Sequence, residues 1–103
     1  MDNSNIYIFK FINWFIMRTS DLLKALADET RLDIVLLLMS GRKNVGQVVV
    51  KIKKSQPNIS LALRQLLMTG IIEQERQGRE VYYKIRKPEQ MMTFLESLEQ
   101  LQK

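Results

Sequence analysis

Two residue types are missing from this chain, which contains no cysteine and no histidine. Without cysteine it can form no disulfide, no thiolate metal site and no thiol redox switch. Without histidine it lacks the commonest metal ligand and the commonest general acid–base group. A glycine-rich phosphate loop and a carboxylate pair in an apolar setting are also missing. We therefore expect no metal site, no cofactor, no catalytic residues and no enzymatic activity.

Long apolar runs are missing as well. The most apolar segment, from Ile6 to Met17, has 12 residues and includes Lys10 and Asn13. A membrane-spanning helix needs roughly 20 apolar residues. A signal peptide needs a basic start and a small-residue cleavage site, which this segment lacks. We therefore expect no membrane partner and a cytoplasmic location.

Acidic residues are missing from the middle of the chain. No Asp or Glu occurs between Asp33 and Glu73, and the formal net charge of the whole chain is +5. The basic residues of this stretch are Arg42, Lys43, Lys51, Lys53, Lys54 and Arg64. A solvated protein face normally mixes both signs of charge, so a basic stretch of this length indicates a polyanionic partner.

What is present is the pattern of one small, mainly α-helical (α+β) domain of 103 residues. The expected elements are helices at 6–17, 21–27, 29–39, 45–53 and 55–69, strands at 71–77 and 80–85, and a helix at 88–103. Ser20, Asp28 and Ser55 are the expected N-caps of three helices. Leu22 and Leu23 are expected on the buried face of the second helix.

Residues 45–68 have the pattern of a helix-turn-helix, in which a short helix and a polar turn precede a helix with a polar N-terminal half. Residues 71–85 would form the hairpin wing that follows. Ile59, Leu63 and Leu66 fall on one side of the second helix. The opposite side is therefore expected to enter the major groove of DNA, where side chains reach the base edges.

The candidate contacts to DNA fall into three groups. The candidate base-reading residues of the second helix are Ser55, Gln56, Asn58, Ser60, Leu61, Arg64 and Gln65. Lys51, Lys53 and Lys54, at the corner between the helices, are the candidate phosphate contacts. Arg76, Gln77 and Arg79 are the candidate wing contacts. Asn and Gln pair with adenine, Arg pairs with guanine, and Leu contacts the methyl group of thymine.

Three blocks of this sequence resemble the ArsR/SmtB family of dimeric winged-helix repressors. The blocks LLKALADETRLDIVLLL, SQPNISLALRQLLMTGII and QGREVYYKI are similar to the family patterns LKALADPTRLxIL, LSQSTVSxHLxxLxxAGLV and REGRxVYYxL. They occur in order and at the right separations over residues 22–85. The resemblance implies a winged helix-turn-helix of five or six helices with a two-stranded wing. It also implies a homodimeric transcription regulator, expected to be a repressor, that binds an inverted-repeat operator in double-stranded DNA.

Carried over residue by residue, the resemblance covers the DNA contacts better than the sensing residues. Ser55, Gln56, Asn58 and Ser60 match the start of the family's recognition helix, and Arg79 matches the arginine of its wing tip. Many members carry a Cys-x-Cys where this chain has Asn44 and Gly46. Soft and borderline metals prefer sulfur and imidazole, so we expect no regulation by transition metals. A small apolar molecule, a protein partner, or no effector at all remain as alternatives.

The two ends of the chain are expected to form a homodimer interface. The resemblance implies that the first and last helices, residues 1–18 and 88–103, pair with those of a second copy. The candidate interface residues are Phe9, Ile12, Phe15, Ile16, Phe94, Leu95, Leu98 and Leu101. For the aromatic N-terminal segment, a ligand pocket and contact with a membrane surface are further alternatives. A second hypothesis for the whole chain is a winged-helix interaction module that docks a partner through this apolar helix.

Overall fold

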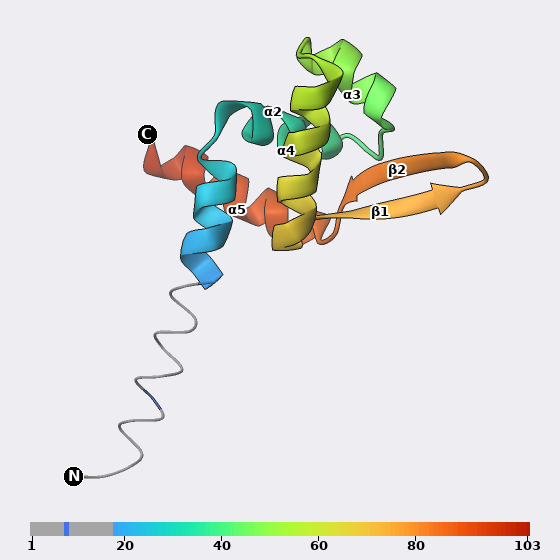
Figure 1. Ribbon diagram of the computed structural model, residues 1–103. Coiled ribbons are helices and arrows are strands. Elements are labelled where there is room, and N and C mark those ends of the chain that lie inside the picture. Colours follow the sequence, from blue (N-terminus) through green and yellow to red (C-terminus); the bar gives the residue numbers. More distant parts are fainter. Residues whose placement is uncertain (1–7, 9–17) are drawn as a thin grey trace.

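The computed structural model describes residue 8 and residues 18–103 of the chain (Figure 1). Residues 18–26 are helical and are followed by α2 (Glu29–Leu38), α3 (Val45–Ile52) and α4 (Gln56–Thr69). An antiparallel hairpin of β1 (Ile72–Gln77) and β2 (Glu80–Ile85) precedes α5 (Pro88–Leu101). The predicted mainly helical class with a two-stranded hairpin is thus confirmed. Among the described helices, none is long and apolar enough to cross a membrane.

The helix ends show which of the predicted caps form. The Asp28 carboxylate accepts a hydrogen bond from the Arg31 amide at 2.9 Å, and Ser55 Oγ accepts one from the Asn58 amide at 3.4 Å. Both N-caps are therefore confirmed. The prediction for Ser20 is wrong, because the helix of residues 18–26 already contains it. A serine inside a helix costs only about 0.5 kcal/mol relative to alanine, so helical neighbours override its preference for a cap.

One apolar core lies between α2, α3 and α4, and the base of the hairpin closes it. Its most deeply buried side chains are Ile34, Val35, Val48, Ile59, Leu63, Leu66 and Ile72. α4 supplies three of these from one face, as the spacing of its apolar residues predicts. The core therefore fixes which side of α4 points outward.

The apolar anchor of the hairpin lies at its base. Ile72 and Ile85 pair in register there, and both are buried. The Lys43 backbone adds a bridge to the outer edge of β2 through two hydrogen bonds with Tyr83, of 3.0 and 2.8 Å. The turn uses Gly78 at a positive φ of 64°, which a glycine adopts without steric strain. The outer half of the hairpin then projects away from the helices (Figure 1).

The first and last described helices leave apolar side chains uncovered. Leu22 and Leu23 are 40% and 49% exposed, so the prediction that they are buried is wrong for a single chain. Ala25 is the side chain of this helix that enters the core. α5 contains no buried residue, and its Leu98 and Leu101 are exposed. The core of one chain is thus too small to cover the apolar faces of both helices.

Candidate nucleic-acid interface

α3 supports the candidate interface, and a local hydrogen-bond pair defines where it begins. Asn44 Oδ1 accepts a hydrogen bond from the Gln47 amide at 2.9 Å, and Gln47 Oε1 accepts one from the Asn44 amide at 2.8 Å. This capping box favours a helix, although the valine-rich segment that follows also suits a strand. Val48 is completely buried and holds α3 against the core.

The turn between α3 and α4 presents three lysines. Lys53 ends α3 in the left-handed conformation, with φ of 62°, and Lys51 and Lys54 stand on either side of it. All three side chains are exposed. Within the described part of the chain, no carboxylate lies within ion-pair distance of any of them. Their charges are thus available to a polyanion at the place where phosphate contacts are predicted.

α4 turns a mixed polar and apolar side to solvent, opposite its buried stripe. Of the predicted base-reading residues, Ser55, Gln56, Asn58, Leu61, Arg64 and Gln65 are exposed and Ser60 is half-buried. Leu61 is 50% exposed. A helix with such side chains free along one side can read base edges in a major groove, and a leucine there can contact the methyl group of thymine.

Gln65 differs from the other candidates because its side chain is hydrogen-bonded to another side chain of the described residues. Its Oε1 accepts a hydrogen bond of 2.7 Å from Nη1 of Arg31. Arg31 also donates to the carbonyl oxygens of Ala25, at 2.7 Å, and Lys24, at 3.2 Å. Arg31 thereby links the end of the helix of residues 18–26 to α4. Gln65 Oε1 keeps a second lone pair, but the bond to Arg31 fixes the direction in which the amide group points and so restricts a bidentate contact with adenine.

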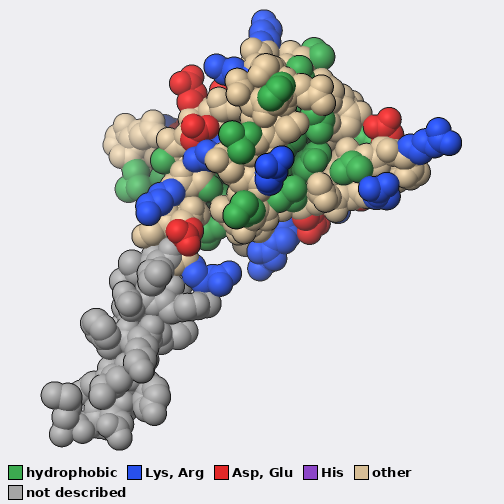
Figure 2. All heavy atoms as spheres, viewed as in Figure 1, with side chains coloured by type: hydrophobic (Ala, Val, Ile, Leu, Met, Phe, Trp, Pro, Cys, Tyr) green, Lys and Arg blue, Asp and Glu red, His purple; other side chains and the backbone are tan. Residues whose placement is uncertain are grey.

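The wing residues fall into two classes. Arg76 and Arg79 are exposed, and no described carboxylate lies within ion-pair distance of either guanidinium. Gln77 is bound instead, since its Oε1 accepts a hydrogen bond of 2.6 Å from Nη2 of Arg42. Figure 2 shows Lys and Arg side chains over the α3–α4 corner, at the top of the view, and at the far end of the hairpin. These two basic regions flank the exposed side of α4.

The predicted interface residues are described only in part. Phe9, Ile12, Phe15 and Ile16 lie outside the described residues. In α5, Phe94 and Leu95 are half-buried, and Leu98 and Leu101 are exposed. A groove of about 900 Å³ separates the helix of residues 18–26 from α5 and reaches the end of α4. This region lies away from the wing and from the α3–α4 corner (Figure 1).

Comparison with known families and sequences gives one match to a family model and several relatives. Residues 28–74 match the model for bacterial regulatory proteins of the arsR family. The arsenical resistance operon repressor of Escherichia coli K12 is 43% identical over 65 residues, which are 62% of this chain and 56% of that repressor. The chain spans about half the length of the curated relatives it matches.

Solved structures share this architecture over most of the chain. The transcriptional regulator HlyU from Vibrio vulnificus CMCP6 aligns with a TM-score of 0.70 at 29% identity, over 87% of this chain and 96% of that one. The homodimeric winged helix-turn-helix DNA-binding domain of a possible ArsR-family regulator from Mycobacterium bovis aligns with a TM-score of 0.76. The alignment covers 85% of this chain and 83% of the mycobacterial domain at 23% identity, so it shows a similarity of fold alone. The predicted winged helix-turn-helix is thereby confirmed.

Proposed function

Because this chain belongs to the ArsR family of bacterial regulatory proteins, we propose that it is a transcription regulator that binds double-stranded DNA as a homodimer. We also propose that its operator is an inverted repeat and that its binding represses transcription. The relatives that are named repressors support the direction of regulation, and the homodimeric mycobacterial domain supports the dimer. The family is one of regulators, in agreement with the expectation that the chain is not an enzyme. We place its action in the cytoplasm, where bacterial operators lie.

The observation that carries this proposal is the exposed side of α4, flanked by two groups of cations that form no ion pair within the described residues. Lys51, Lys53 and Lys54 lie just before the first turn of α4, and Arg76 and Arg79 lie in the outer part of the hairpin that follows α4. We assign the lysines to phosphate contacts, which position a protein on DNA without reading its sequence. The polar residues of the first turns of α4 and Arg64 are assigned to base edges.

We further propose that transition metals do not regulate the protein. Asn44 stands where many family members carry a cysteine, and here it forms the cap of α3. The chain as a whole has no sulfur or imidazole donor other than methionine thioether. Zinc, nickel, cadmium, copper(I) and arsenite should leave the affinity for operator DNA unchanged in gel-shift titrations. Tight stoichiometric binding of one of them with loss of the DNA complex would contradict this.

Selection of bound duplexes from a random pool tests the main proposal. We expect enrichment of an inverted repeat whose half-sites lie roughly 34 Å apart, one turn of DNA. Binding to the selected duplex should fall steeply with salt, since phosphate contacts release counterions. A chain that docked a protein through an apolar helix would instead enrich no sequence and show no such salt dependence.

A further inference from the structure

Arg42, in the loop between α2 and α3, makes side-chain contacts that set it apart from the other cations of the basic stretch. Its Nη1 donates to Glu75 Oε1 at 3.1 Å, and its Nη2 donates to Gln77 Oε1 at 2.6 Å. Its guanidinium carbon also lies 4.2 Å from the centre of the Tyr82 ring. Three side chains of the hairpin therefore hold one arginine, whereas Lys53 and Arg79 have no ion pair within the described residues.

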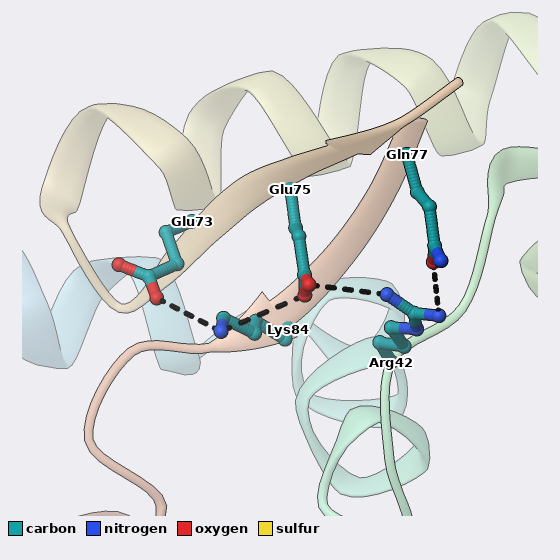
Figure 3. Close-up of polar contacts among 5 residues, drawn as sticks. All are labelled: Arg42, Glu73, Glu75, Gln77 and Lys84. Atoms are coloured by element: carbon teal, nitrogen blue, oxygen red, sulfur yellow. Dashed lines mark hydrogen bonds and ion pairs between the residues drawn. The ribbon is translucent and has the colours of Figure 1, made fainter. Parts of the chain in front are cut away.

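The strand register explains how one side chain reaches all three partners. Glu75 lies opposite Tyr82 in the antiparallel pairing, and Glu75 and Gln77 are two residues apart on β1, so all three share one face of the hairpin. The Lys43 backbone pairs with the outer edge of β2. Arg42 starts beside that edge and reaches Glu75 and Gln77 on β1 (Figure 3). On the way its guanidinium group lies over the Tyr82 ring. The Arg42 side chain therefore contacts both strands of the hairpin.

The ionic contacts continue along the same face toward the base of the hairpin. Lys84 Nζ lies 3.6 Å from a carboxylate oxygen of Glu73 and 3.6 Å from one of Glu75 (Figure 3). Glu75 is therefore shared by Arg42 and Lys84. An exposed ion pair by itself contributes little, but a planar guanidinium with two acceptors and an aromatic face has a defined geometry.

The outer half of the hairpin has few other attachments. Two side-chain hydrogen bonds join the hairpin to the rest of the described chain, and Arg42 donates both of them. The hairpin extends about 20 Å from its base, so a rotation of roughly 10° at the base would move the turn by about 3 Å. That displacement is as long as a hydrogen bond, so a contact made by Arg79 depends on how the hairpin is held.

We propose that Arg42 is a positioning residue of the wing, which fixes the hairpin so that Arg79 reaches the DNA, and that it is not itself a phosphate contact. The inference rests on the proposed DNA binding. Its consequence is that Arg42 and Arg79 act as one unit, since the first residue matters only through the second.

Charge-matched variants test the proposal on the duplex selected above. Arg42→Lys keeps the charge but cannot hold two acceptors and the ring together, so we expect it to lose about five- to tenfold in affinity, like Arg42→Ala. Tyr82→Leu leaves the net charge unchanged and should lose affinity in the same direction. Lys43→Ala is the matched control, because among the described residues Lys43 Nζ is hydrogen-bonded only to Ser40 and Gly41 of its own loop. We expect a smaller loss there, of about twofold.

A double-mutant cycle then separates positioning from simple charge. In an Arg79→Ala background, Arg42→Ala should cause no further loss of affinity. Wild-type affinity of Arg42→Lys, or losses from Arg42→Ala and Arg79→Ala that simply multiply, would overturn the proposal and make Arg42 a phosphate contact.

Hydrogen exchange keeps the test independent of DNA. Without DNA, the amides of residues 77–80 should exchange faster in Arg42→Ala than in Lys43→Ala. Equal exchange rates in the two variants would show that Arg42 does not hold the hairpin, even if the protein bound DNA. If the wild type bound no duplex, the proposed function would fail, and the exchange experiment would still decide whether Arg42 holds the hairpin.

Discussion

Lys53 occupies a backbone position at which glycine is the usual residue. Its φ of 62° at the end of α3 is left-handed, a conformation that costs a residue with a Cβ about 1 kcal/mol or more. Lys53→Gly should therefore raise the free energy of unfolding by about 0.5–1 kcal/mol, as measured by denaturant titration. If the ammonium group also contacts a phosphate, the same variant should bind DNA more weakly, with a salt slope lower by about 0.9.

Lys54 provides the control for the Lys53→Gly prediction, in which stability rises while DNA binding weakens. It neighbours Lys53 but has no left-handed backbone. Lys54→Ala should weaken DNA binding in a similar way while leaving stability within about 0.5 kcal/mol of the wild type. A Lys53→Gly variant that bound DNA as tightly as the wild type would show that this lysine does not contact phosphate.

Base reading and phosphate contact predict different patterns of loss for single residues. Asn58 and Arg64 lie on the exposed side of α4, so Asn58→Ala or Arg64→Ala should cost roughly 1–3 kcal/mol of discrimination between the selected site and its point variants. Lys54→Ala should weaken binding to all of these duplexes about equally. Competition gel shifts on a panel of single-base variants measure both effects. Identical profiles for the two groups would contradict the assignment of α4 as the recognition helix.

Among the elements, those with strong local signals are the ones that the sequence predicts well. The stripe of Ile59, Leu63 and Leu66 predicts which side of α4 is buried, and Gly78 predicts the hairpin turn. Both signals act over a few residues, through helical periodicity and backbone conformation.

Contacts between distant side chains were not predictable from the sequence. Arg31 and Gln65 are 34 residues apart, and Arg42 and Gln77 are 35 apart. In sequence, Arg42 is one more cation of an acid-free stretch, and Gln77 is one more polar residue near a turn. Only the fold brings them together, and it thereby changes the expected role of both glutamines. The prediction that Leu22 and Leu23 are buried is wrong for a related reason. Their periodicity predicts an apolar face of the helix but does not say which molecule covers that face.

The wing as an element makes a separate prediction about the DNA that flanks the half-sites. Arg79 follows Gly78 at the turn, is exposed and has no ion pair with a described residue. An arginine in a minor groove responds to the narrow width and negative potential of A·T-rich DNA. Arg79→Ala should therefore weaken binding most on duplexes with A·T-rich flanks and leave the melting temperature nearly unchanged. Equal weakening on G·C-rich flanks would indicate a phosphate contact, and no weakening would mean that the wing does not touch DNA.

For the whole molecule, the uncovered apolar faces predict a dimer that forms away from the DNA-binding side. Leu22 and Leu23 on the first described helix and Leu98 on α5 are exposed, although each is large and apolar. A stable interface buries about 1,200–2,000 Å² in total, and apolar side chains dominate its centre. A second copy that covered these helices would supply the core that one chain lacks, and would hold two α4 helices at a fixed spacing on the DNA.

Leu98→Glu tests this arrangement because its effect depends on whether the face is covered. On an exposed face of a monomer the substitution should change stability by less than about 0.5 kcal/mol. In a dimer interface it buries a carboxylate, so it should convert the protein to a monomer at micromolar concentration in light scattering and abolish binding to the paired half-sites. Leu36→Glu is the matched control, since Leu36 is a comparably exposed leucine on α2, outside the predicted interface, and should leave the oligomeric state unchanged. A wild-type protein that scattered as a monomer would remove the homodimer from the proposal, and a Leu98→Glu variant that remained dimeric would move the interface away from α5.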